Sequence, residues 1–427
     1  MMVSSKFKVI EHSIPCQSIR EYHRAGKREN PSLQLAIKQY IPLENTTSGL
    51  EGVTIIAGHA NGIPKECYEP IWEELLSLTS VNIKAIWIAD SSNQGASGVI
   101  NENELGDDPN WFDHSRDLLY MVNHFRDQIQ APIVGIAHSF SCSQFVHLSI
   151  MHPRLFQSLV FIDPMIQNES PSKLGGPSPA LWTSRRPDFW PSAQDAEKHI
   201  RENGFWRKWD PKCVDQYIRF GLRPAPTALY PDSDSAAVTL TTTKAQEAWS
   251  YLRLNATPRD EKGEFNKESF LNPDLATVPR EGDNNHPDWA LVCPWCCIAF
   301  EYLLYVRPAV LYIFGERSHI NPPERRADKL ERTGKGLGGS GGVAAGRVRS
   351  EILSKGSHMA PLEKVHDTAQ LLSGWLESQI KVYQAEKDFW NHHESGKSEQ
   401  NGVALSKEWM KYVQQPVETK RAIKSNL

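Results

Sequence analysis

The segment that most constrains the fold runs through residues 131–141, with the sequence Ala-Pro-Ile-Val-Gly-Ile-Ala-His-Ser-Phe-Ser. A short apolar run ends in small residues around Ser139, and a pattern typical of a helix follows over residues 142–151. A strand, a sharp turn and a helix with serine at the tip is the layout of a nucleophile elbow, Gly-x-Ser-x-Gly. Ala137 and Ser141 replace the two glycines and are small enough for the turn. A plain strand-to-helix junction is the alternative.

Composition limits the possible classes of protein. The chain has 427 residues, which suffices for one large domain with an insertion or for two domains. A net charge of -4 provides no general basic field, so nucleic acid is not an expected partner. Seven cysteines in apolar segments predict free thiols and a reducing compartment. No apolar run reaches the roughly 18 residues of a membrane-spanning helix.

Apolar strands alternate with amphipathic helices over much of the chain, which predicts a parallel sheet covered by helices on both faces. The expected fold class is therefore α/β, with a mostly parallel eight-stranded sheet whose first two strands suit an antiparallel edge. Asp113 is expected to cap one of the helices. The expected strands are residues 7–14, 33–41, 53–57, 83–89, 131–137, 158–163, 309–314 and 347–353, and the expected helices are residues 66–78, 113–129, 142–151 and 362–383.

The alternation breaks over residues 165–299, which are rich in Pro and Trp. This stretch is most simply a mainly helical cap inserted after the sixth strand, and its Trp residues would line a pocket for an apolar ligand. We therefore expect a core of residues 1–164 and 300–386 and a charged C-terminal tail of residues 387–427.

A serine nucleophile needs a histidine base and an acid that orients it. In an elbow fold the chain order is Ser, acid, His, with the histidine in the loop after the last strand. Of 15 histidines, His358 alone lies in that loop. His366 is its nearest rival, but it falls a turn or more into the closing helix, where a surface histidine is the ordinary interpretation.

The acid usually lies three residues beyond the glycine that ends the strand after the cap. After Gly315 that position is Ser318, which cannot serve as the acid. Asp163 ends the strand that follows the elbow helix, at the same edge of the sheet as Ser139, and is the preferred candidate. Glu316 is the second candidate, and a turn-forming Asp-Pro is the structural alternative for Asp163.

The tetrahedral intermediate of acyl transfer needs two N–H donors for its oxyanion. One is the backbone N–H of Phe140, which follows the nucleophile. The other should come from Asn61 in the loop Gly58-His59-Ala60-Asn61-Gly62, where Ala60 replaces the usual glycine and His59 is expected to be structural.

Two further motifs predict no bound group. Cys293 and Cys296 have the spacing of a redox or half-zinc site but lack a second pair of ligands, so buried small side chains are favoured. Residues 334–339 match Gly-x-Gly-x-x-Gly without a strand before them or a helix after them, which favours a flexible loop over a dinucleotide site. We expect neither a metal nor a separate cofactor.

Several segments together resemble the fungal peroxisomal α/β-hydrolases of secondary metabolism, a family that contains the acyl-CoA hydrolases of mycophenolic acid biosynthesis. The resemblance covers nearly the whole chain, loosely in the cap and the tail, and it implies an α/β-hydrolase fold. It also implies a Ser139, Asp163, His358 triad and the cleavage of a bulky isoprenoid-derived acyl-CoA thioester, with CoA present only as part of the substrate. The matching segments are residues 58–66, 137–141, 161–164, 338–342 and 358–364.

The same resemblance implies a peroxisomal location. Ser425-Asn426-Leu427 is similar to the Ser-Lys-Leu address that an import receptor reads, although Asn426 departs from it. A homodimer is compatible with the resemblance. A carboxylester or lipid hydrolase with the same triad, and a non-catalytic hydrolase scaffold that binds a ligand, are the alternative functions. Arg185, Arg186, Arg207 and Lys208 could meet the phosphates of CoA or remain solvated.

Overall fold

The computed structural model describes residues 6–43, 52–169, 178–256, 259–263, 294–394 and 403–415. Two compact units divide the chain, Met1–Ile380 and Lys381–Leu427, and the sheet belongs to the first. The second unit contains the end of α12 (Val365–Glu394) and the short helix α14 (Lys407–Val413). The predicted import tripeptide, Ser425-Asn426-Leu427, lies outside the described residues.

An eight-stranded sheet forms the centre of the first unit, in the order β1-β2-β4-β3-β5-β6-β10-β11. β1 and β2 pair antiparallel, β2 meets β4 antiparallel, and the remaining pairs are parallel. This is the predicted α/β-hydrolase sheet with its antiparallel edge. The strands are β1 (Phe7–Pro15), β2 (Gln34–Pro42), β3 (Val53–Gly58), β4 (Ile83–Ala89), β5 (Ile133–His138), β6 (Ser158–Ile162), β10 (Ala309–Gly315) and β11 (Val348–Leu353).

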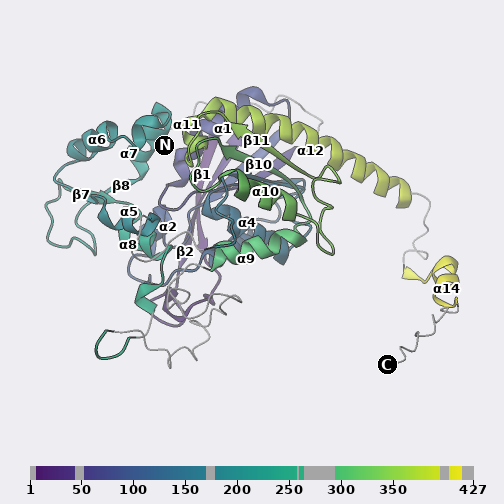
Figure 1. Cartoon of the computed structure of the whole chain (residues 1–427), viewed down its shortest axis with the longest axis horizontal. Helices are drawn as coiled ribbons and strands as arrows, with labels where there is room; N and C mark the ends of the chain where they lie inside the picture. Colours follow the sequence, from purple (N-terminus) through teal and green to yellow (C-terminus); the bar gives the residue numbers. More distant parts are fainter. Residues whose placement is uncertain are drawn as a thin grey trace. The chain divides into compact units, whose positions relative to one another are not determined.

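Helices cover both faces of the sheet because every residue of β3, β5, β6 and β10 is buried and each face needs an apolar cover (Figure 1). One face packs against α3 (Trp111–His124), α4 (Phe140–Met151) and α9 (Trp295–Tyr302). The other face packs against α1 (Glu69–Leu78) and α12. Successive strand residues, such as Leu311 and Tyr312, belong to the two different cores.

Two local predictions in this part of the chain are wrong. The cap of α3 is Asn110, whose side chain accepts a hydrogen bond from the N–H of Phe112, and not Asp113. Asp113 is buried and pairs with Arg20, because the helix starts two residues earlier than its apolar pattern suggested. The turn-rich residues 90–98 predict a loop after β4, but a short helix, α2 (Gly95–Ile100), begins within them.

Between β6 and β10 the chain forms an insert that combines short helices with a small antiparallel sheet of order β7-β9-β8 (Figure 1). The small sheet is absent from the sequence-based expectation because its strands have only two or three residues. α9 packs against α4. The predicted boundaries of the core, the cap and the tail remain predictions. The insert contains α5 (Pro179–Arg185), β7 (Phe189–Trp190), α6 (Ala193–Glu202), α7 (Pro211–Phe220), β8 (Leu222–Pro224), β9 (Val238–Leu240) and α8 (Lys244–Trp249).

The glycine-rich segment after α10 (Pro323–Arg332) is a loop, as predicted, and contains neither a strand nor a helix. Its backbone is hydrogen-bonded to a neighbouring segment: the N–H groups of Gly334 and Gly336 donate to the carbonyls of Leu303 and Leu304 at 2.8 and 2.7 Å. These bonds give the loop a defined path, which the glycine content alone did not indicate.

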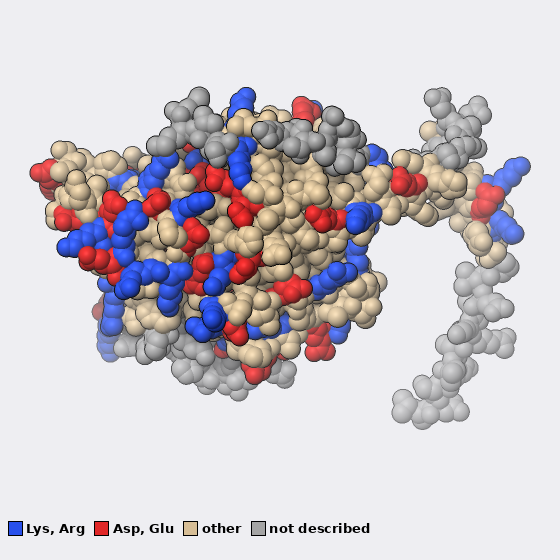
Figure 2. Space-filling model, turned by 90° about the horizontal axis from the view of Figure 1, so that it is seen from above, with Lys and Arg blue, Asp and Glu red and all other residues tan. Residues whose placement is uncertain are grey.

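Charged side chains of both signs are interspersed on the face shown in Figure 2. Such mixing gives short-range fields and no extended area of one sign. Among the described helices, none has both the length and the apolar character that a membrane crossing requires.

Lys329 on α10 is 1 % exposed, and its ammonium group donates to the carbonyl of Arg325 at 3.1 Å. Burial lowers the pKa of Lys329 from 10.5 to about 7. Between these two values the unfolded chain binds more protons than the folded one, so this residue's contribution to folding becomes more favourable as pH rises. Below about pH 7, Lys329 is charged in both states, and the full free-energy cost of burying its charge opposes folding.

Lys329→Met is therefore expected to raise the free energy of unfolding at pH 7, by on the order of 4 kcal/mol. The gain over the wild type should shrink as pH rises toward 10.5. Urea unfolding of both proteins across this pH range measures the effect, with the half-exposed Lys335→Met as control. A gain that does not change with pH would contradict the assignment.

Candidate active site

Ser139 lies at the tip of the turn between β5 and α4, with φ 61° and ψ -121°. Such a conformation is rare for a residue with a side chain and persists only where the surroundings enforce it. The Ser139 N–H donates to the carbonyl of Ile162 at 3.0 Å, and its own carbonyl accepts from the N–H of Met165 at 3.0 Å. The elbow is thus fixed to β6 and to the chain that leaves it.

Ser141 occupies the second glycine position of the elbow without disrupting it. Its hydroxyl donates to the carbonyl of His138 at 2.8 Å and accepts from the N–H of the same residue at 3.1 Å. Space for the side chain comes from Gly58 on β3, where an added Cβ would lie 2.8 Å from the Ser141 Cβ. The departure from the glycine pattern is therefore compensated on the adjacent strand.

The three residues predicted as nucleophile, base and acid lie together in one hydrogen-bonded series. Ser139 Oγ is 2.8 Å from His358 Nε2, and His358 Nδ1 is 2.6 Å from Asp163 Oδ2. Since a carboxylate only accepts, Nδ1 carries the proton and Nε2 is left to accept from the serine hydroxyl. Ser139 and Asp163 are buried, at 5 % and 0 % exposure.

Asp163 is held in place from a second side by the residue at the position where the acid usually lies. The hydroxyl of Ser318 donates to Asp163 Oδ2 at 2.6 Å, and the N–H of Gly315 donates to Oδ1 at 3.2 Å. Burial alone would raise the pKa of Asp163, but the bonds from His358, Ser318 and Gly315 outweigh it and lower the pKa. The group is an ionised acceptor at neutral pH.

Glu316, the second candidate acid, lies elsewhere. Its carboxylate accepts from the N–H of Lys355 at 2.6 Å and from the hydroxyl of Ser354 at 3.4 Å, at the surface. His366, the rival base, pairs with Glu74 at 2.6 Å on an exposed part of α12. Neither side chain reaches the Ser139 site.

The two predicted oxyanion donors both border the cavity above Ser139. Among the described residues, the N–H groups of Phe140 and Asn61 have no acceptor. The Asn61 side chain is fixed, because its Oδ1 accepts from Gln94 and its Nδ2 donates to the carbonyl of Glu247 at 3.2 Å. His59 is buried, donating from Nδ1 to Ala60 and accepting at Nε2 from the N–H of Ser91, which fits its predicted structural role.

A second hydrogen-bonded series runs behind the site through Tyr68 and His138. The N–H of Ala60 donates to Tyr68 Oη at 2.9 Å, which leaves the hydroxyl proton for His138 Nδ1 at 2.7 Å. His138 Nε2 then donates to the carbonyl of His358 at 2.9 Å. Burial lowers the pKa of His138 to about 3, so the ring stays neutral. Sequence reasoning missed this series because its members are far apart in the chain.

A cavity of about 520 Å³ opens over Ser139 and His358. The insert supplies much of its wall, and of the described Trp residues predicted to line a pocket, Trp182 and Trp206 do so. Arg186 and Lys208 also line it, whereas Arg185 and Arg207 are exposed elsewhere. The aromatic lining residues are Trp111, Phe140, Trp182, Phe205, Trp206, Tyr217 and Tyr251.

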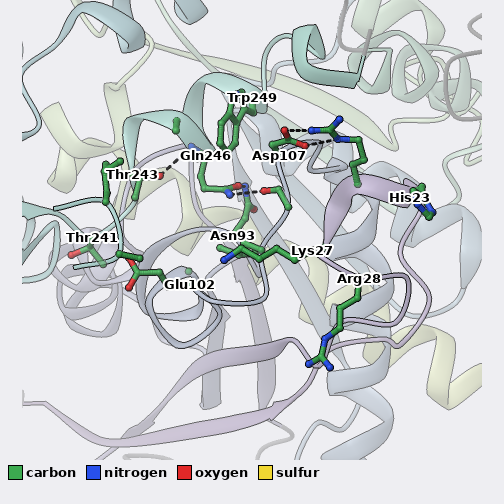
Figure 3. Close-up of a pocket in the computed structure, with 18 of the residues that line it drawn as sticks. His23, Lys27, Arg28, Asn93, Glu102, Asp107, Thr241, Thr243, Gln246 and Trp249 are labelled. Atoms are coloured by element: carbon green, nitrogen blue, oxygen red, sulfur yellow. Dashed lines mark hydrogen bonds and ion pairs between the residues drawn. The ribbon is translucent and has the colours of Figure 1, made fainter. Parts of the chain in front are cut away.

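A second cavity, of about 610 Å³, lies beside α8 and contains none of the predicted site residues (Figure 3). Most of its charged lining side chains are paired within the protein: Arg24 with Asp107, Arg28 with Glu104, and Arg223 with Glu102. Asn93 donates to Gln246 at 3.3 Å across its floor. Ser139 and His358 line the first cavity and not this one.

No family model matches the chain. It is 36% identical to the type I acyl-CoA thioesterase mpaH of Penicillium roqueforti over 433 residues, which is 96% of each protein. The mpaH thioesterase of Penicillium brevicompactum is also 36% identical, over 100% of this chain and 99% of that one. The chain belongs to this acyl-CoA thioesterase family. The resemblance stated from the sequence motifs is thereby confirmed, and the protein is a hydrolase.

Among solved structures, this thioesterase is similar to the peroxisomal α/β-hydrolase Lpx1 of Saccharomyces cerevisiae. The TM-score is 0.64 and the sequence identity 16%, over 93% of this chain and 100% of Lpx1. At that identity the likeness concerns the fold, and it agrees with the predicted α/β-hydrolase architecture. An abhydrolase domain-containing protein of Alternaria alternata, AFT2-1, is 26% identical over 67% of this chain and 99% of its own length.

Proposed function

We propose that the thioesterase hydrolyses a bulky, isoprenoid-derived acyl-CoA of the mycophenolyl-CoA kind through a Ser139, His358, Asp163 triad. The observation that carries the proposal is the continuous series from Ser139 Oγ to Asp163, below a cavity lined by aromatic side chains. The mpaH relatives support thioester cleavage. CoA enters only as part of the substrate, and no metal or cofactor takes part.

In this mechanism His358 Nε2 takes the proton of Ser139 while Oγ attacks the thioester carbonyl. The N–H groups of Phe140 and Asn61 donate to the oxyanion that forms. When the C–S bond breaks, His358 Nε2 gives this proton to the CoA sulfur, so CoA leaves as the thiol and His358 is neutral again. A water molecule, deprotonated by His358, then attacks the acyl-enzyme and releases the carboxylic acid and free Ser139.

The experiment that tests the thioester preference compares acyl-CoA thioesters with oxygen esters of the same acyl groups. We expect a higher kcat/KM for the thioesters, and for branched isoprenoid chains over short linear ones. Faster hydrolysis of the oxygen esters would favour the carboxylester or lipid hydrolase alternative. A fluorophosphonate probe that fails to label Ser139 in the folded protein would favour the non-catalytic scaffold.

Location and assembly belong to the same proposal. We propose import into the peroxisome through a receptor that reads Ser425-Asn426-Leu427, supported by the likeness of this tripeptide to Ser-Lys-Leu. A fluorescent fusion with a free C-terminus should colocalise with a peroxisomal marker and become diffuse when Leu427 is deleted. The homodimer is tested by light scattering during size exclusion, where a monomer mass would exclude it.

Tyr68→Phe is expected to lower kcat by about 10- to 100-fold with little change in KM, because a buried group left unpaired costs about 1–3 kcal/mol. The substitution removes the donor to His138 Nδ1 and the acceptor for the Ala60 N–H, which together position His358 and the Asn61 loop. Tyr312→Phe is the matched control, since that buried hydroxyl is hydrogen-bonded to Thr333 Oγ1, at 2.7 Å, away from the Ser139 site. Equal kcat values for the two variants would deny Tyr68 a positioning role.

A further inference from the structure

One ion pair stands inside the aromatic cavity, formed by Arg186 at the end of α5 and Glu247 on α8. Among the described lining residues, the other lysine or arginine is Lys208, which is exposed. The Glu247 side chain is 7 % exposed and that of Arg186 is 24 % exposed. A charged pair in a wall that is otherwise mainly apolar costs desolvation free energy, which suggests that the pair has a function in the cavity.

The geometry fixes the guanidinium group of Arg186. Its Nη1 and Nη2 donate to the two carboxylate oxygens of Glu247 at 3.2 and 2.5 Å, in a forked arrangement. Thr183 Oγ1 donates to the same carboxylate at 2.8 Å. Glu247 in turn packs directly on the oxyanion loop, because an added Cβ on Gly62 would lie 2.1 Å from its Oε2.

This arrangement leaves hydrogen-bond donors unused in the cavity that Ser139 and His358 also line. Each Nη nitrogen carries two hydrogens, and Glu247 takes one from each. Among the described residues no other acceptor contacts these nitrogens. The Glu247 carboxylate balances the charge and repels a second anion, so the free hydrogens suit an uncharged oxygen better than a phosphate. The exposed Lys208 is the better contact for a phosphate of CoA.

We propose that Arg186, held by Glu247, is a subsite for an uncharged carbonyl oxygen of the thioester substrate, located a few bonds from the scissile C–S bond. The oxygen comes either from a keto or lactone group of the acyl chain or from an amide of the pantetheine arm. This subsite rests on the proposed function. With it, the insert would select substrates by the position of a carbonyl oxygen as well as by the size of the apolar chain.

The test has two arms and uses the full chain. The first compares decanoyl-CoA with oxodecanoyl-CoAs that carry one ketone at successive positions. The second compares the decanoyl thioester of N-acetylcysteamine, which keeps one amide, with the S-butyl thioester, which has none. The variant Arg186→Met with Glu247→Gln removes the pair without leaving a buried charge alone. Arg185→Met, an exposed neighbour on α5, is the matched control.

In at least one arm, the wild type and Arg185→Met should have a kcat/KM tenfold or more higher for the substrate with the carbonyl. This ratio corresponds to one hydrogen bond to a charged group, about 1.5–3 kcal/mol. The double variant should lose that preference, because its kcat/KM for the substrate with the carbonyl falls by more than its kcat/KM for the substrate without it. An equal loss on both members of each pair would show a purely structural clamp and overturn the proposal, as would a wild type without any preference.

Failure of the proposed function gives a different result. In that case the wild type hydrolyses none of these thioesters. Calorimetric affinities of wild type and double variant for the same pairs then decide the subsite: equal affinities within every pair overturn it, and a preference that only the wild type has supports it.

Discussion

Ser139→Ala should lower the turnover of an acyl-CoA thioester by on the order of 10⁴-fold or more, with the protein still folded. The serine hydroxyl is the atom that attacks in the proposed mechanism, and it lies 2.8 Å from His358 Nε2. The members of such a triad act as a unit, so losing one removes most of what the three provide. Release of CoA, followed with a thiol reagent under saturating substrate, measures the effect.

Ser149→Ala is the matched control for this change. Ser149 is a buried serine on the same helix, and its hydroxyl donates to the carbonyl of Val146 at 2.7 Å, within α4 itself. Its activity should stay near that of the wild type. If Ser139→Ala retained most of the thioesterase activity, the covalent mechanism would be wrong and the elbow would be only a structural turn.

Asp163→Asn is expected to reduce kcat by roughly 10³- to 10⁴-fold, because an amide in this position no longer offers a charged acceptor to His358 Nδ1. The histidine would lose both its orientation and the stabilisation of its protonated form. The 2.6 Å contact between His358 Nδ1 and Asp163 Oδ2 is the basis for this size of effect. A pH profile of kcat measured with a decanoyl thioester records it.

Two variants distinguish Asp163 from its neighbours. Glu316→Gln should be nearly silent, because that carboxylate binds Lys355 and Ser354 at the surface. Ser318→Ala should have an intermediate effect, since it removes one donor to Asp163 and leaves the Gly315 N–H in place. If Glu316→Gln lost most of its activity and Asp163→Asn kept its activity, the role of the acid would belong to Glu316.

The sequence predicts those residues of the candidate site whose positions follow from the order of the triad along the chain and from the ends of the strands. Ser139 follows a recognisable strand, and His358 occupies the one loop where a base was expected. Asp163 emerged because Ser318 could not be an acid, yet the structure gives that serine a task of its own as a donor to Asp163. The pattern identified the residues but not how they support one another.

The remaining features could not be predicted because they depend on contacts between distant segments. The Tyr68 hydroxyl meets His138 across 70 residues, and His138 meets His358 across 220. The pairing of Arg186 with Glu247 joins two short helices of the insert whose packing no periodicity reveals. The strands β7, β8 and β9 are likewise too short for their side chains to show an alternating pattern.

The glycine that the elbow lacks at position 141 has a counterpart on a neighbouring strand. Because Gly58 on β3 leaves the room that the Ser141 side chain fills, the need for a small residue has moved to a neighbouring strand 83 positions earlier in the chain. Positions 58 and 141 therefore form an epistatic pair, in which the effect of a substitution at one depends on the residue at the other. A search that requires both elbow glycines would overlook such chains, whereas a joint volume criterion for the two positions would retain them.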